Sequence, residues 1–382
     1  MRDKIGSLEA IALLLIIVLN HVILSLPKNI IATTGSSSLL NIIFVSILVL
    51  FFVMFITKIF NKFPGYDLLD ISKFLGGKPL KYITGVLFIL YFISFSSITL
   101  RNFSENLKIV YFQNYPITLI LFLFILAIVG CNYLGIKSIV RGNFIVLPVL
   151  LLSIFFIFFA TIEHFNYQDL FPVLGDGFYS TFISGMSNIY AFSAISVLYF
   201  LPKHLNHFSE IKKIGYWFIF LSFILLIFSI ATVLLIFPVI SNAEQIAPLY
   251  LAARLIEFGR FFQRIDAIFL LVWIISVISY LSFIIALSIN IFRDLFELEN
   301  SNMIICSISL LCLGFSLIPK NLVQIRFFTN TFFRYLTIGL VFFFVFFILF
   351  FANLKLLKRE KGVQLKWKNF LKYFYYYLLQ FI

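Results

Sequence analysis

Hydrophobic residues form a series of long runs along this chain, and short polar stretches separate them. A hydrocarbon core about 30 Å thick is crossed by a helix of roughly 20 apolar residues. Runs of that length predict ten transmembrane helices, and the pattern therefore indicates an all-α polytopic membrane protein. The runs lie near residues 7–32, 37–60, 82–108, 116–133, 139–161, 178–201, 214–238, 265–292, 302–318 and 330–353.

The composition agrees with a membrane protein. Of the 382 residues, 62% are hydrophobic and only 12% are charged, and the mean hydropathy is +1.08. A soluble domain of this length could not bury so much apolar surface. The 53 Phe residues are also what an AT-rich genome encodes, so they say little about any site. The net charge of +13 is scattered over the loops, which favours anionic lipid over nucleic acid as its counterpart.

The distribution of positive charge predicts the orientation. With ten crossings both termini lie on one side, and 20 of the 29 Lys and Arg residues fall on that side. Cytoplasmic segments are enriched in Lys and Arg, so both termini are predicted to be cytoplasmic. We divide the chain into a ten-helix domain, 1–353, and a basic and aromatic tail, 354–382, expected to lie along the inner headgroups. Residues 241–262 predict a loop and a short amphipathic helix on the outer face.

Two of the predicted spans are interrupted by polar or helix-weakening residues. The first contains LNHVILSLPKN, from Leu19 to Asn29. The sixth contains SGMSNIYAFSA, from Ser184 to Ala194, and ends in YFLPK. These spans lead the two halves of the chain, a pattern typical of a 5+5 inverted repeat that binds its ligand near the midplane between two broken helices. Backbone groups freed by such breaks are tolerated only where they face protein, water or ligand.

The interruptions supply the predicted ligand-binding residues, which are Asn20, His21, Val22, Leu24, Gly185, Ser187, Asn188 and Phe192. Asn and His in the middle of a span must satisfy their polar atoms inside the protein, and a wet cavity is one place to do so. A kinked helix without a ligand is the alternative. Replacement of Asn41, at the start of the second span, is expected to weaken the ligand response far less than replacement of Asn20.

Further polar residues lie within other spans. Arg101 and Glu105 are four residues apart and can pair on one helix face, either as a gating pair or as a structural pair. Ser276, Ser279 and Ser282 form a polar stripe, which indicates either a cation site or packing between helices by small residues.

Catalytic chemistry is not indicated. The sequence contains no HExxH, GxSxG or phosphate-binding loop motif and no Cys or His cluster, so we expect no enzyme activity, no metal site and no cofactor. Cys131, Cys306 and Cys312 lie in or beside apolar runs and are expected to be core residues.

Six short motifs, in order along residues 5–353, resemble the spore germination permease family. They are SLPKNI, FNKFPGYDLLDISKFLGGKPL, RNFSENL, LGIKSIVRGNFIVLP, NYQDLFPVLGDG and FFQRIDAIFLLVWI. The family comprises the B subunits of germinant receptors and is a branch of the amino acid–polyamine–organocation (APC) superfamily. The resemblance implies a LeuT-like fold, a nutrient ligand such as an amino acid, residence in the spore inner membrane, and assembly with an A subunit and a C-subunit lipoprotein.

Two positions depart from the family pattern. Asn20 and His21 stand where many members have Gly-Thr or Gly-Ser, and Ala191–Ala194 reads AFSA where many have a Pro-Phe-Gly-Glu-like stretch. The function expected from the sequence is a germinant-sensing subunit that acts through partner subunits or ion flux. The alternative is an amino acid transporter of the same fold with alternating access. Both need different ligand affinities in two conformations, so binding alone does not separate them.

Overall fold

The computed structural model describes residues 4–238, 247–256, 265–298 and 302–361. In these residues the regular structure is helical, apart from one isolated bridge between Ile5 and Leu205. The α-helices are α1 (Ser7–Leu24), α2 (Leu26–Thr34), α3 (Ser38–Phe60), α4 (Leu68–Val110), α5 (Ile117–Tyr133), α6 (Ile136–Ala160), α7 (Ile195–Leu198), α8 (Ile211–Ile236), α10 (Pro248–Arg254), α11 (Ile265–Phe296), α12 (Asn302–Ser316), α13 (Leu322–Phe327), α14 (Arg334–Thr337) and α15 (Val345–Lys361). Tighter 3₁₀ segments are η1 (Gly35–Ser37), η2 (Ile162–His164), η3 (Tyr167–Leu170), η5 (Ser184–Phe192) and η6 (Phe208–Glu210). Wider π segments are η4 (Tyr179–Ile183), η7 (Phe328–Phe333) and η8 (Ile338–Phe344).

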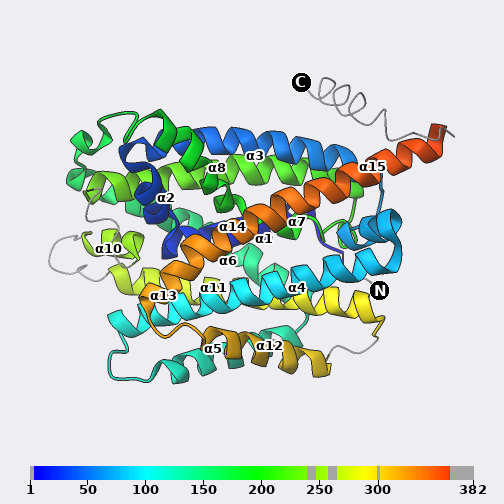
Figure 1. Cartoon of the computed structure of the whole chain (residues 1–382). Helices are drawn as coiled ribbons and strands as arrows, with labels where there is room; N and C mark the ends of the chain where they lie inside the picture. The colour runs from blue at the N-terminus through cyan, green and yellow to red at the C-terminus, as the bar shows by residue number, and fades with distance from the viewer. Residues whose placement is uncertain (1–3, 239–246, 257–264, 299–301, 362–382) are drawn as a thin grey trace.

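The long helices run side by side in one bundle, with their connections at its two ends (Figure 1). We name the end that holds the start of α1 and the end of α15 the terminal end. The opposite end, which holds η2, η3 and α10, is the distal end. The described part of the chain has seven helical segments long and apolar enough to cross a bilayer, and α5 and α12 are shorter apolar helices. The predicted all-helical membrane fold is confirmed, whereas the count of ten crossings stays a prediction.

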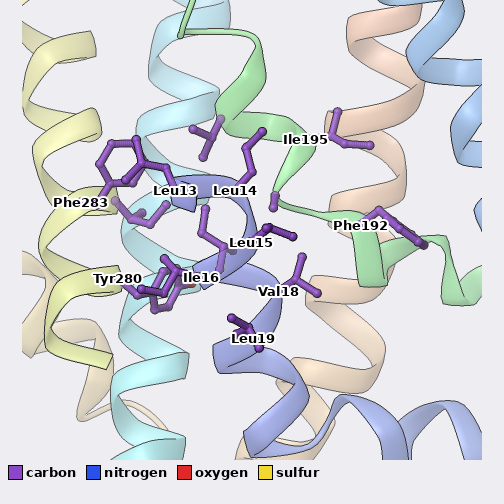
Figure 2. Close-up of a cluster of buried hydrophobic side chains, with 14 of the residues drawn as sticks. Leu13, Leu14, Leu15, Ile16, Val18, Leu19, Phe192, Ile195, Tyr280 and Phe283 are labelled. Atoms are coloured by element: carbon purple, nitrogen blue, oxygen red, sulfur yellow. The ribbon is translucent and has the colours of Figure 1, made fainter. Parts of the chain in front are cut away.

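Helix α1 runs through the middle of the bundle and is buried along most of its length. It packs against α6, α8 and α11. Figure 2 shows its aliphatic side chains between Tyr280 and Phe283 of α11 on one side and Phe192 and Ile195 on the other. A helix surrounded by protein on every side needs no polar face, which explains why residues 10–19 of α1 are apolar on every side.

Polar residues inside the bundle are mostly satisfied by their own helix. The hydroxyls of Ser46, Thr57, Ser97 and Ser229 each donate to the carbonyl oxygen four residues earlier, at 2.6 to 2.7 Å. This local bond removes the cost of a free hydroxyl in an apolar environment. Polar atoms that lack such a bond are therefore the informative ones.

Helix α4 contains two helical parts joined at a glycine pair. Gly76 and Gly77 leave the helical conformation, and Gly77 has a φ of 72°, a value that side-chain-bearing residues rarely adopt. The first part, from Leu68, lies at the terminal end, and the second crosses the bundle. Lys355 of α15 donates to the carbonyl oxygens of Phe74 and Leu75, at 2.8 and 3.0 Å, and so caps the end of the first part.

The segment expected on the outer face is partly described, and there the expectation is wrong. Helix α10 packs against α8, α11 and α1 instead of lying on the surface. Pro248, Leu249, Tyr250, Ala252 and Ala253 are all buried, because this stretch is apolar on every side except at its end. The part of the tail from residue 362 onward lies outside the described residues, so its predicted position is not tested.

Candidate functional site

The interruption of the first span is a single sharp break at Ser25. Helix α1 ends at Leu24, and Ser25 has φ and ψ of −160° and −6° before α2 begins at Leu26. The Ser25 N–H still donates to the His21 carbonyl at 3.1 Å, and the Ser25 carbonyl accepts from the Asn29 N–H at 3.0 Å. Pro27 follows at the second position of α2, where its missing N–H costs nothing. The break lies within the predicted LSLPK stretch.

The sixth span is interrupted differently: it has no sharp break, and its helix type changes over a long stretch. It starts as the π segment η4, continues as the 3₁₀ segment η5 and becomes α-helical only at α7. A nine-residue 3₁₀ helix is unusually long and marks a region under local strain or with a function. Its three residues per turn place Ser187, Tyr190 and Ser193 in one row, whereas an α-helix would not.

A small cavity lies where the two interrupted spans meet. Its walls come from the α1–α2 break, η5, the middle of α4 and η7. The residues that line it are His21, Leu24, Ser25, Leu26, Asn29, Phe95, Ile98, Thr99, Asn102, Tyr190, Ala191, Ser193, Thr329 and Phe333. Its volume of about 30 Å³ accommodates one or a few waters and is far below the roughly 300 Å³ of a typical ligand pocket.

A second cavity, of about 20 Å³, extends the first toward the distal end. The two share Leu24, Ser25, Asn29, Asn102 and Thr329 in their walls. The second adds two cations, Lys28 and Arg326, and further amides such as Asn106 and Asn330. Together the cavities form a path of mixed polar and apolar lining from the break toward the start of α10.

The structure places the predicted residues of the first span in two different environments. His21 and Leu24 line the first cavity. The His21 ring packs on Phe95, with 4.8 Å between ring centroids, and its Nε2 lies 3.3 Å from the Tyr280 hydroxyl. Val22 is fully buried and does not line either cavity.

Asn20 turns toward α11 instead of the cavity. Its Nδ2 donates to Ser276 Oγ at 2.9 Å and to the Ile16 carbonyl at 2.8 Å, while its buried Oδ1 has no partner among the described residues. Within the same part of the chain Ser282 is buried with an unpartnered hydroxyl, and Ser279 is half-buried against Gly142 of α6. One residue of the predicted stripe thus contacts α1, and a cation at this position stays a prediction.

The predicted residues of the sixth span also separate. Asn188 donates from Nδ2 to Asn41 Oδ1 at 2.8 Å and to Thr33 Oγ1 at 2.9 Å, and Asn41 donates to the Thr181 carbonyl at 2.8 Å. This network connects α2, α3 and the rewound span, so the expectation that Asn41 matters little is not supported by its position. A Cβ at Gly185 would collide with Asn41 Nδ2, so this glycine serves close packing. Phe192 belongs to the apolar core around α1 (Figure 2).

Arg101 and Glu105 form the expected ion pair. Arg101 Nη2 lies 2.8 Å from Glu105 Oε1, and the two side chains are 6% and 15% exposed. Asn102, the residue after Arg101, lines both cavities. The pair therefore lies on α4 next to a residue of the cavity wall, and its functional role stays a prediction.

Sequence reasoning did not find the charged cluster at the terminal end. Lys203, in the YFLPK motif that ends the sixth span, lies 2.7 Å from Asp67 Oδ2, 3.1 Å from Asp70 Oδ2 and 3.0 Å from Asp294 Oδ2. Lys81 donates to the Asp294 carbonyl at 2.6 Å. These bonds join the sixth span to the start of α4 and the end of α11. The contributing stretches are far apart in sequence, so no local pattern could have indicated them.

Burial and neighbouring charges shift the pKa values of Asp67 and Lys203 in opposite directions. Burial raises the pKa of Asp67 to about 6, although Lys203 favours its ionised form. Burial alone would lower the pKa of Lys203, but the carboxylates of Asp67, Asp294 and Asp70 raise it above its usual value. Lys203 is therefore charged, and it holds three carboxylates together.

Known proteins resemble this chain both in sequence and in fold. The model of a family described as "Spore germination protein" matches residues 4–325. Spore germination protein A2 of Bacillus subtilis (strain 168) is 24% identical over 279 residues, which are 72% of this chain and 75% of that protein. Spore germination protein XB of Bacillus anthracis is 27% identical over 232 residues, 59% of this chain and 62% of that protein. Spore germination protein B2 of Bacillus subtilis (strain 168) is 20% identical over 191 residues, 50% and 52% of the two chains.

Among solved structures, the chain resembles Mhp1, a nucleobase-cation-symport-1 family transporter. The closed conformation with bromovinylhydantoin bound gives a TM-score of 0.59 at 12% identity, covering 88% of this chain and 76% of that one. The inward-facing conformation gives 0.54 at 13% identity, covering 89% and 74%. Identity this low shows the fold alone. The LeuT-like fold implied by the family resemblance is confirmed.

Proposed function

This chain belongs to the spore germination protein family, and from that premise we propose that it is the B-type subunit of a germinant receptor. It binds a small nutrient, such as an amino acid, between the two interrupted spans. Binding is passed to an A subunit and a C-subunit lipoprotein, or to an ion path. The protein is a multi-pass integral membrane protein, and in this proposal it resides in the spore inner membrane with the terminal end in the cytoplasm.

The cavity at the Ser25 break is the observation that carries this proposal. It brings together His21, Asn29, Asn102, Tyr190 and Ser193 from spans far apart in sequence. Polar side chains and broken backbone are expensive at membrane depth, and they are found where a ligand or water is held. Sites of this kind lie at the interface between the two repeats of inverted-repeat transporters.

The size of the cavity indicates that nutrient binding is coupled to a conformational change. At about 30 Å³ the cavity is too small for an amino acid, so a nutrient can bind there only if the surrounding spans move apart. A ligand that binds the open form better than the closed form shifts the population toward the open form. Such a shift is the physical basis of a signal to partner subunits.

A matched pair of substitutions on α1 tests the ligand site. We expect His21→Ala to raise the nutrient concentration needed for half-maximal germination by about tenfold or more, equal to roughly 1.4 kcal/mol. Val22→Ala removes a comparable apolar contact outside the cavity and should leave the nutrient concentration unchanged. The measurement is the dose response of spores that carry each variant with its partner subunits, using a mixture of amino acids as probe. If the two variants respond alike at equal protein levels, the ligand does not bind at this break.

Uptake by the isolated chain distinguishes a sensor from a transporter. Vesicles that contain this chain alone are supplied with a labelled amino acid mixture. We expect no net uptake, since a sensing subunit needs only to bind. Accumulation that depends on an ion gradient would instead support a transporter with alternating access.

A further inference from the structure

A buried arginine that has no carboxylate partner among the described residues lies in the middle of the last helical run. Arg334 begins α14, between the π segments η7 and η8, and is only 6% exposed. It is twelve residues, or about 18 Å along a helix, from the start of α13 at Leu322. The sequence pattern starts the tenth span at residue 330 and so places this charge near the membrane surface. In the structure the run starts at 322, and the charge lies about 18 Å along the run from that start, buried inside the bundle.

The neighbours of Arg334 leave most of its hydrogen-bonding capacity unused. Nη1 lies 3.4 Å from Ser187 Oγ, a long and weak bond, and the buried Nε has no partner in the part of the chain that the structure describes. The ion pairs found within the described ranges belong to Arg101 and Lys203, and none involves Arg334. Intramembrane cations normally pair with an anion or line a wet path, because an isolated charge at this depth is strongly unfavourable.

The guanidinium group lies directly behind the wall of the first cavity. It stacks on the ring of Tyr190, 4.7 Å from the ring centre, and Tyr190 is part of the cavity wall. The Tyr190 hydroxyl is itself buried, with no partner among the residues described. Phe333, which precedes Arg334, lines the same cavity. The 3₁₀ winding of η5 places Ser187 and Tyr190 on one face, so both side chains meet the same arginine.

We propose that Arg334, with Ser187 and Tyr190, binds the carboxylate of the nutrient in this cavity. The proposal rests on the proposed function and names its ligand class, a small molecule that carries a carboxylate. Arginine presents N–H groups in a fork that matches a carboxylate oxygen pair. In this proposal a displacement of the Tyr190 ring exposes the guanidinium to the cavity, and the unpartnered Tyr190 hydroxyl becomes a further donor to the carboxylate.

The contacts of Arg334 favour a bound anion over aromatic stacking alone. Stacking of a cation on one ring stabilises it by much less than its transfer to membrane depth costs. The start of α2 also faces the cavity, but Pro27 lacks an N–H, which weakens a carboxylate site built from that helix end alone. Arg334 is therefore a stronger carboxylate ligand than the start of α2.

The test uses the simplest carboxylate as probe. The thermal unfolding midpoint of the purified full chain in lipid nanodiscs is measured with increasing sodium acetate, acetamide or sodium chloride. We expect acetate to raise the midpoint of the wild type, and acetamide and chloride not to. Arg334→Gln should weaken the apparent acetate affinity by about tenfold or more, and Arg334→Lys should retain part of it. Arg293→Gln is the matched control and should behave as wild type, because this arginine also has a buried Nε but lies at the end of α11 and lines neither cavity.

Ser187→Ala keeps the test decisive if Arg334→Gln does not fold. Loss of one hydrogen bond should weaken acetate binding by about threefold. Any one of three outcomes would overturn the carboxylate assignment. They are an equal acetate response in all variants, no acetate response in the wild type, and a response to chloride equal to that to acetate. If acetate binds through Arg334 while His21→Ala leaves germination unchanged, the anion site stands and the proposed function fails.

Discussion

The terminal and distal ends of the bundle are closed by different interactions. At the terminal end one lysine, Lys203, holds three carboxylates from two other elements at 2.7 to 3.1 Å. The distal end has no comparable cluster among the described residues. There the path from the break is narrowed by amides and apolar side chains around two cations, Lys28 and Arg326. The terminal closure therefore depends on a few strong contacts that share one lysine, whereas the described wall of the distal path is made of amides, apolar side chains and two cations.

This difference indicates how the molecule opens. Weak, distributed contacts can be rearranged by a small ligand, because each one costs little to break. A cluster of ion pairs behaves as a unit and opens only when its central charge loses its partners. We therefore expect the terminal end to stay closed until the contacts of Lys203 are broken.

The largest effect is expected from removing the central charge. Lys203→Met leaves three carboxylates around an apolar side chain, and breaking a buried ion pair costs up to about 5 kcal/mol. We expect a large drop in the thermal unfolding midpoint and faster labelling of a cysteine introduced beside the cluster. Lys213→Met, at an exposed lysine of α8, is the control. If both variants unfold alike, the cluster does not hold the terminal end closed.

A smaller effect is expected from the ion pair behind the cavity. Arg101→Glu and Glu105→Arg each create a like-charge pair inside the bundle and should destabilise it by about 4 kcal/mol. The double exchange restores opposite charges on the same helix face and should recover much of the loss. The readout is the fraction of monodisperse protein after extraction. A double variant no better than the worse single variant would show that the two residues act independently.

The smallest effect is a pH dependence at Asp67. Its pKa of about 6 exceeds the usual 3.8, so the folded protein binds a proton more readily than the unfolded chain does. The contribution of this group to stability is therefore fully present below about pH 4 and is lost as the pH rises to about 6. The lost contribution is about 3 kcal/mol. Asp67→Asn removes this dependence, so its unfolding midpoint should rise relative to wild type over the same interval. A constant difference between the two midpoints from about pH 4 to pH 7 would contradict the assignment.

The fold and the first break could be predicted because both depend on local sequence. Apolar length identifies the spans, and Pro27 with Ser25 marks where a helix is interrupted, since each weakens the helix in place. The resemblance to a permease family agrees with the same elements.

The orientation of individual site residues could not be predicted in this way. A residue set such as Gly185, Asn188 and Phe192 follows α-helical spacing, but η5 is wound with three residues per turn. Tyr190 therefore lines the cavity, and Asn188 turns toward α3. Asn20 finds a partner on α11 that its own sequence neighbourhood does not reveal. The ion cluster at the terminal end and the burial of the arginine in α14 depend on tertiary contacts, which a single sequence does not contain.

The first part of α4 mechanically connects two distant elements of the chain. Its start carries Asp67 and Asp70, which hold the end of the sixth span through Lys203, and its last carbonyls accept the hydrogen bonds from Lys355 of α15. Gly77, whose φ of 72° suits a residue without a side chain, separates this short helix from the transmembrane part of α4. Through these contacts a movement of the sixth span would be transmitted to α15.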